Sequence, residues 1–145
     1  MAWTRSFTTY TTASAEAVWK RHITPADWVQ DDPVTTAAAF TVPPRTGDTG
    51  TVTAQGSTRT FTFTEVRPGE VMTQVFALLP GAQLVLGHTL ERTVRGLRVT
   101  HTVSLTGPLG RFLVPIAGWP LVRSRPAVVH SIVTRALDES TAAAR

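Results

Sequence analysis

Residues 97–106 read LRVTHTVSLT, the clearest β pattern in the chain. One set of alternate side chains is apolar except for His101, and the side chains between them are Arg, Thr or Ser. Such alternation is typical of a strand with one face buried and one face in water. We therefore predict a strand here, in a sheet that covers a core with one face, and we place His101 on the buried face.

A period of two also runs through the preceding sequence, from Val34 onward. Turn signals such as Pro68-Gly69 and Pro80-Gly81 divide this region into short segments. The predicted strands are 34–42, 50–56, 59–67, 70–79, 83–92 and 97–106. Since the links between them are short, neighbouring strands should pair antiparallel. Residues 3–12 are rich in β-branched and aromatic types and predict a further strand, which makes seven.

Helices are predicted on both sides of this sheet region. Ser14 is a suitable N-cap for a short helix over 15–22. Thr24-Pro25 begins a second short helix, which carries Trp28. After Gly107-Pro108 the apolar residues recur at helical spacing. Three prolines, at positions 115, 120 and 126, predict a kinked or broken helix over 109–125 and a continuous one from about 126 to 139.

Length and composition limit the classes of protein that need to be considered. The 145 residues, 42% hydrophobic and 17% charged, fit one domain spanning 1–145 and exclude a disordered chain. The absence of cysteine excludes disulfides, thiolate zinc sites and thiol nucleophiles. The N-terminus lacks an apolar signal core, and the longest apolar run, 112–122, is shorter than the ~20 residues that span a bilayer. We expect a cytoplasmic protein without an integral membrane segment.

The positive charge is unevenly distributed. Net charge is +4, and the stretch from Arg92 to Leu137 contains seven arginines and no acidic residue. Such a stretch favours contact with phosphate or acidic lipid, although a solvated positive face is the simpler interpretation. No basic stripe with stacking aromatics and no nucleic-acid-binding motif is present, so we expect no nucleic-acid partner.

Two histidines fall on apolar faces of adjacent predicted strands. On strand 83–92, His88 shares a face with Leu84, Leu86 and Leu90. Because both apolar faces must meet one core, the hairpin register places His88 opposite either Val103 or His101, with the imidazoles roughly 5–8 Å apart. The pair is interpreted either as hydrogen-bonded core histidines or as polar groups in a ligand pocket. A zinc site would need a third ligand, and His22 and His130 fall on helices, so no metal or cofactor is predicted.

A carboxylate is the third candidate for acid–base chemistry. Strand 59–67 puts Phe61, Phe63 and Glu65 on one face. If that face points inward, Glu65 lies near one end of the pocket and could exchange protons with His88 or His101. The alternative is a carboxylate in water at the end of a strand. Catalytic triad spacing, GxSxG, Walker and GxGxxG motifs are all missing from the sequence.

The segment 112–122 is apolar on all sides and is flanked by Arg111 and Arg123. A helix of this kind must bury a second face. It could seal a pocket, contact a second copy in a homodimer, or touch a membrane surface with Trp119 at the interface. Ordinary core packing explains the pattern equally well.

Several stretches of the sequence resemble a known superfamily. They are Ser14 to Trp19, the segment of Trp28 near Asp31-Asp32-Pro33, Phe61 to Gly69, Gly96 to His101, and Leu105 to Leu109. Together they resemble the START-like, Bet v 1-like helix-grip proteins, specifically the bacterial polyketide cyclase/dehydrase group. The resemblance implies an α+β fold in which a seven-stranded curved antiparallel sheet surrounds a long C-terminal helix, with two short helices after the first strand. It also implies a cavity for apolar molecules, without a shared catalytic motif.

Three functions follow from the residues and the resemblance together. The first is binding of a small hydrophobic, lipid- or polyketide-like molecule between the sheet and the C-terminal helix. The second is a cyclase or aromatase activity that uses cavity histidines, and the third is a protein- or membrane-interaction module that uses 112–122. The residues expected to contact the ligand are Trp28, Phe61, Phe63, Leu86, His88, Val99, His101, Val103, Phe112, Ile116 and Trp119.

Overall fold

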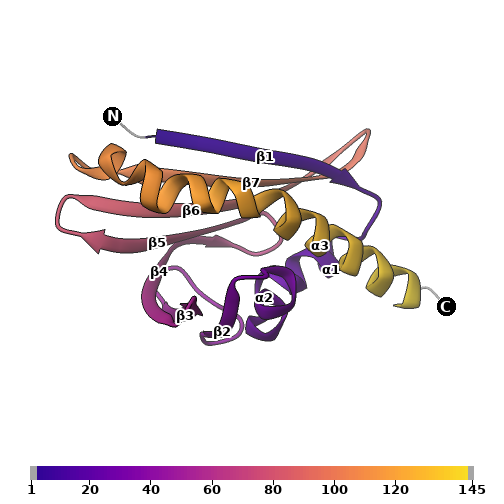
Figure 1. The fold of residues 1–145 in the computed structure, drawn as a ribbon. Helices are drawn as coiled ribbons and strands as arrows, with labels where there is room; N and C mark the ends of the chain where they lie inside the picture. Colours follow the sequence, from indigo (N-terminus) through magenta and orange to yellow (C-terminus); the bar gives the residue numbers. More distant parts are fainter. Residues whose placement is uncertain (1–2, 144–145) are drawn as a thin grey trace.

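The computed structural model describes residues 3–143 and contains one seven-stranded antiparallel sheet. The strand order is β1-β7-β6-β5-β4-β3-β2, and a long C-terminal helix lies across one face of this curved sheet (Figure 1). The expected α+β helix-grip architecture is therefore confirmed. The strands are β1 (Trp3–Thr11), β2 (Thr35–Ala39), β3 (Thr49–Ala54), β4 (Ser57–Arg67), β5 (Val71–Leu79), β6 (Ala82–Thr93) and β7 (Gly96–Thr106).

Two short helices connect β1 to β2, as the sequence predicted. They are α1 (Ala15–His22) and α2 (Pro25–Asp31). The Ser14 hydroxyl accepts a hydrogen bond from the backbone N–H of Ala17 at 3.1 Å and so caps α1. The indole N–H of Trp28 donates to the carbonyl of His22 at 2.9 Å and ties α2 to the end of α1.

The C-terminal helix is longer than the sequence predicted. A 3₁₀ turn, η1 (Gly110–Leu113), and a π turn, η2 (Val114–Gly118), lead directly into α3 (Trp119–Ala143). The predicted break is therefore confined to 110–118, and the expectation that the continuous helix begins only at Pro126 is wrong. Pro120 lies in the first turn of α3, directly after the point where the π turn passes into the α-helix. Pro126 lies on the exposed side, while its neighbour Arg125 is buried and holds the helix to the core.

The register of the β6–β7 hairpin decides between the two pairings expected for His88. Thr93 pairs with Gly96, so the turn consists of two residues, Val94 and Arg95, and His88 lies opposite His101. Gly96 has φ +110°, and a Cβ at this position would lie 2.7 Å from the carbonyl oxygen of Thr11. This close approach of β1 requires glycine after the turn.

A β-bulge in β4 changes which residues face the core. The pairing of β4 with β5 shifts between Phe63 and Glu65, so Thr64 is an extra residue without a partner. Phe61 and Phe63 are buried before the bulge, and Val66 packs against the core after it. Because side chains alternate with a period of two, the extra residue turns Glu65 outward.

Arg21 joins the three helices through buried ion pairs. Its Nε donates to Asp31 Oδ2 at 2.9 Å, and its Nη1 donates to Glu139 Oε1 at 2.7 Å. The side chains of Arg21 and Asp31 are only 2% and 3% exposed. The guanidinium therefore connects α1 to α2 through a buried ion pair and to α3 through Glu139, whose side chain is 37% exposed.

Replacement of Arg21 by Met should lower the free energy of unfolding by about 3–5 kcal/mol, because it removes the guanidinium from the buried Asp31 carboxylate. Asp31 then keeps its hydrogen bond from the Ser131 hydroxyl at 2.8 Å and the more distant Arg135 at 3.6 Å. Urea denaturation followed by circular dichroism measures this change. The matched control is Arg67→Met, which removes a salt bridge between side chains that are 60% and 50% exposed. The control should cost no more than about 1 kcal/mol. Equal losses in the two variants would contradict a special role for Arg21.

Candidate functional site

Three buried histidines meet between the sheet and α1. His88 and His101 are cross-strand neighbours on β6 and β7, with ring centroids 4.4 Å apart. His22, the last residue of α1, brings its Nε2 to 2.9 Å from Nε2 of His101. The rings of His22 and His88 are 5.4 Å apart. The sequence placed His88 and His101 together but did not assign His22, because only the packing of α1 on the sheet brings it there.

Burial keeps the histidine cluster neutral. Desolvation is the largest cause that lowers the pKa of His88 well below 6.5, and a positive charge on His22 or Arg125 would lower it further. Desolvation likewise lowers the pKa of His101 well below 6.5, assisted by His88, His22 and Arg125. Desolvation also lowers the pKa of His22, in part against the hydrogen bond to Val18. All three imidazoles are therefore uncharged at neutral pH.

The hydrogen bonds assign a tautomer to each neutral ring. His22 Nδ1 lies 2.8 Å from the carbonyl of Val18, so this nitrogen carries the proton. His22 Nε2 then has a lone pair and accepts from Nε2–H of His101. His101 Nδ1 is left with a lone pair and, within residues 3–143, with no partner. His88 Nδ1 donates to the carbonyl of Met72 at 3.1 Å, which leaves its Nε2 as an acceptor.

Two further buried side chains offer hydrogen-bond donors without acceptors. Arg125 on α3 makes an ion pair with Asp32 at 3.0 Å, but its Nε has no partner among the described residues. Gln74 on β5 is 2% exposed, and its Nε2 has no partner there either. Gln74 lies between Phe63 and Leu86 on the inner face of the sheet. Neither residue was singled out from the sequence, since an isolated Gln on a strand or Arg on a helix carries no motif.

The apolar walls around these groups are only partly buried. On the sheet side, Leu86, Leu78 and Val66 pack against the buried aromatic cluster and keep part of their surface accessible. The helical side contributes a matching set of partly buried residues, Leu113, Val114, Ala117 and Leu121. Both sets of residues therefore pack against the same buried aromatic cluster without being fully covered themselves.

The predicted ligand-contacting residues fall into three groups. Phe61, Phe63, Val99 and Val103 are buried in the packed core, as are His88 and His101. Leu86 and Trp28 are partly exposed and lie beside the aromatic cluster. Phe112, Ile116 and Trp119 are exposed and lie outside the interior. The inner side of their segment is occupied by Leu113, Ala117 and Gly118, so helical spacing turns the three larger side chains to solvent.

Glu65 does not reach the histidines. The bulge at Thr64 turns it to the outer face of β4, where it accepts a hydrogen bond from Nε of Arg67 at 3.0 Å. Glu65 is therefore a carboxylate in water, which was the second interpretation of its position in the sequence. The expectation that it lies at one end of the pocket is wrong.

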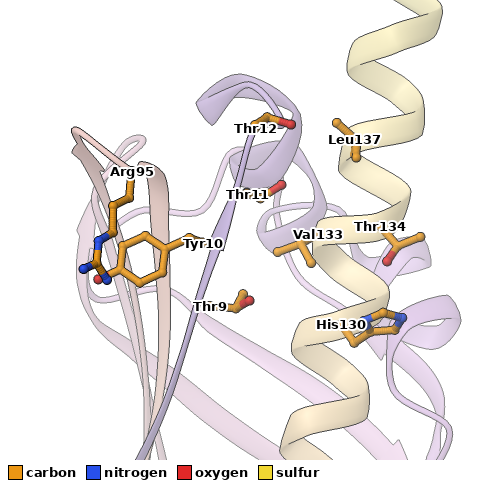
Figure 2. Close-up of a pocket in the computed structure, with 9 residues that line it drawn as sticks. All are labelled: Thr9, Tyr10, Thr11, Thr12, Arg95, His130, Val133, Thr134 and Leu137. Carbon is orange, nitrogen blue, oxygen red and sulfur yellow. The ribbon is translucent and has the colours of Figure 1, made fainter.

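Two open hollows lie on the surface. One, of about 420 Å³, lies between β1 and the second half of α3, with Arg95 at its edge (Figure 2). Its lining includes the hydroxyls of Thr9, Thr11, Thr12 and Thr134. The other, of about 630 Å³, borders the β5–β6 turn and the end of β7. Neither is lined by a residue that the sequence predicted to bind a ligand.

The described part of the chain contains neither a metal-binding group of side chains nor a membrane-spanning helix. Among residues 3–143, no group of three or more histidine or acidic side chains has the arrangement of a metal site. No helix there is long and apolar enough to cross a membrane.

Comparison with known proteins finds similarity in structure alone. No protein-family model and no curated protein matches the sequence. The di-domain ARO/CYC StfQ of the steffimycin biosynthetic pathway matches with a TM-score of 0.73 and 10% identity over 97% of this chain and 52% of that one. Ara h 8.0201 matches with a TM-score of 0.69 and 12% identity over 95% and 99%. Norcoclaurine synthase from Thalictrum flavum matches with a TM-score of 0.66 and 14% identity over 94% of both chains.

These neighbours are helix-grip proteins, so the resemblance inferred from the sequence is confirmed at the level of the fold. At identities of 10–14% the similarity carries no residue roles across.

The neutral histidines predict a pH dependence of stability. Their pKa values are lowered in the folded chain, so the unfolded chain binds more protons below pH 6.5, and the folded state loses stability as the pH falls. The expected slope is up to about 1.4 kcal/mol per pH unit for each histidine. Urea denaturation at a series of pH values from 7.5 to 5.5 measures this slope. The two limits lie about one unit above and below the ordinary histidine pKa.

In this titration His88→Gln should reduce the slope, because it removes one of the three buried imidazoles. An unchanged slope in His88→Gln would show that His88 is charged when folded.

Proposed function

We propose that the protein binds a small, largely apolar molecule between the inner face of the sheet and the η1–α3 segment. The observation that carries the proposal is the combination of two partly accessible apolar walls with buried polar atoms that have no partner in the described part of the chain. Ligand sites in proteins commonly combine apolar walls with a few polar groups that orient the ligand.

In this proposal the apolar side chains of the sheet and of the helical segment provide the affinity for the ligand. Leu86 and Leu78 on the sheet and Leu113 and Leu121 on the helical side pack against the same aromatic cluster. Each of these side chains retains surface that an apolar ligand would remove from water. Burial of apolar surface contributes roughly 25 cal/mol per Å², so a lipid- or polyketide-like body is the ligand that these walls suit best.

The unpartnered polar atoms provide the selectivity. Gln74 Nε2 and Arg125 Nε are donors, and they would be satisfied by a ligand oxygen such as a carbonyl or carboxylate. The lone pair of His101 Nδ1 would accept from a ligand hydroxyl. A buried donor or acceptor without a partner costs about 1–3 kcal/mol, and a ligand that pairs with these atoms recovers that free energy.

The structural neighbours are consistent with a small-molecule ligand. One is named as an ARO/CYC of a biosynthetic pathway and another as norcoclaurine synthase. Both proteins are therefore associated with small organic molecules, and this supports the proposed ligand class for a chain with the same fold.

Gln74→Leu separates recognition of the ligand's oxygen from apolar binding. Leu fills a similar volume and removes the unpaired donor, so stability should stay constant or rise. Affinity for the fluorescent fatty acid parinaric acid should fall about tenfold, which corresponds to about 1.4 kcal/mol. Affinity for diphenylhexatriene, which has no polar group, should not change. Fluorescence titration measures both.

The control for this experiment is Gln83→Leu, an exposed position on β6, which should bind both probes like the unchanged protein. If neither probe binds the unchanged protein, the proposal of an apolar site is wrong. If Gln74→Leu weakens both probes equally, the residue acts through the shape of the site and not through its amide.

An enzyme of the cyclase or aromatase type is the second candidate. The observation that favours it is the cluster of uncharged histidines, because a neutral imidazole presents a lone pair that can take a proton from a bound substrate. His88 is the candidate base, since its Nδ1–H is oriented by the Met72 carbonyl and its Nε2 is left with a lone pair.

Simultaneous replacement of His88 and His101 by Gln tests this chemistry. The substrate is first sought by denaturing the purified protein and identifying the released molecules by mass spectrometry. We expect turnover of that compound to fall by about 10²–10⁴ in the double variant, the usual contribution of acid–base catalysis. Binding of diphenylhexatriene should persist and serves as the control for folding. Unchanged turnover would exclude the histidine mechanism.

A further inference from the structure

One end of the molecule exposes a group of large apolar side chains. Leu109, Phe112, Ile116 and Trp119 are 44%, 63%, 75% and 41% exposed. The last three are spaced by four and three residues, so they project from one side of the η1–α3 segment. We call these four residues the apolar end face. Figure 1 shows the segment at the same end of the molecule as the start of β1 and the β5–β6 turn.

The packing beneath this face prevents it from turning inward. A Cβ at Gly118 would lie 2.9 Å from the ring of Trp3 and 3.2 Å from Leu105, so the segment already sits as close to the sheet as its backbone allows. Trp119 makes an edge-to-face contact with Trp3 at 5.7 Å. Rotating the segment to bury Ile116 would break these contacts, so the exposure is built into the fold.

Arginines surround the apolar end face. The guanidinium of Arg111 lies 5.1 Å from the ring of Phe112, and that of Arg5 lies 5.6 Å from the ring of Trp119. Arg123 follows Trp119 by one helical turn and is exposed. No acidic residue occurs between Arg92 and Leu137 to balance these charges.

Acidic side chains of the helices lie at the opposite end of the molecule. Glu16 belongs to α1, and Asp138 and Glu139 belong to the last turns of α3. Figure 1 shows α1 and the end of α3 away from the η1 segment. The molecule therefore has a positive apolar end and a separate end that carries acids.

The combination of exposed apolar side chains with arginines distinguishes between two possible partners of the apolar end face, a second copy of the chain and a lipid bilayer. In a two-fold dimer through it, Arg5, Arg111 and Arg123 of one copy would approach the same arginines of the second copy, and like charges would repel. An anionic bilayer surface instead attracts each of them, while the aromatic and aliphatic side chains enter the interfacial layer. Tryptophan favours this layer because its ring is apolar and its N–H can still reach water.

We propose that the apolar end face docks the protein on an anionic lipid bilayer surface, with Phe112, Ile116 and Trp119 inserted between the lipids and the arginines on the headgroups. This inference goes beyond the proposed ligand binding and does not depend on it. Leu113 and Ala117 on the inner side of the same segment form a wall of the proposed ligand site. Docking therefore brings that site next to a source of apolar molecules.

Flotation with vesicles tests the proposal. One vesicle population contains phosphatidylcholine alone, and the other contains phosphatidylcholine with phosphatidylserine. The unchanged protein should bind the anionic vesicles and should release them at high salt, because salt screens the arginines. Ile116→Glu should reduce binding at least about tenfold, since it removes an inserted side chain and adds a repelled charge. The double variant Arg111→Gln, Arg123→Gln should reduce binding to anionic vesicles selectively.

The matched control is Val94→Glu, the same kind of change at a fully exposed position in the β6–β7 turn, far from the η1 segment. It should bind vesicles like the unchanged protein. Absence of binding to anionic vesicles, or equal loss in Val94→Glu and Ile116→Glu, would overturn the proposal. So would a homodimer in light scattering that Ile116→Glu dissociates. Titration with diphenylhexatriene keeps the two proposals distinguishable, because Ile116→Glu should leave that affinity unchanged.

Discussion

The buried guanidinium of Arg21 is the interaction on which the arrangement of the helices depends. It holds Asp31 at the end of α2 and Glu139 near the end of α3, although its own helix, α1, has only eight residues. A helix this short has little stability of its own in water. The ion pairs and the packing of Val18 fix its position on the sheet. The residue after Arg21 is His22, so the same clamp decides where that imidazole lies.

The histidine cluster is a consequence of this placement. The β6–β7 register alone would leave His88 and His101 side by side, and α1 adds His22 with its Nδ1 already bonded to the carbonyl of Val18. Two rings are oriented by backbone carbonyls, and the third is oriented by its neighbour. The result is a neutral, ordered polar region inside an otherwise apolar core. Gln74 Nε2 and Arg125 Nε add buried donors that have no acceptor among residues 3–143.

The η1–α3 segment contributes two surfaces with different properties. Its inner side packs Leu113, Ala117 and Gly118 against the sheet and the aromatic cluster. Its outer side leaves Phe112 and Ile116 in solvent beside arginines. The sequence is apolar on both sides, and only one side can reach the core. The proposed ligand site and the proposed lipid contact are therefore separated by the thickness of one helical segment.

Local periodicity was sufficient for most of the fold. Alternation of apolar and polar residues located the seven strands to within a few residues, and the cap at Ser14 located α1. The same alternation placed His88 and His101 on one buried face, because the side-chain direction in a strand depends only on parity. The exact pairing stayed open between two registers of equal parity until the two-residue turn at Val94-Arg95 was known.

Other features could be found only in the tertiary structure, because they depend on how segments of the chain pack against one another. The orientation of Glu65 depends on one unpaired residue in β4, which shifts parity without a sequence signal such as glycine. The continuity of α3 through Pro126 depends on packing that outweighs the lost hydrogen bond. His22 joins the site through the clamp of Arg21, 118 residues from Glu139. The sequence pattern determines the local preferences for strand, helix and turn. The packing of the whole chain determines which of two apolar faces is buried and which polar groups meet in the interior.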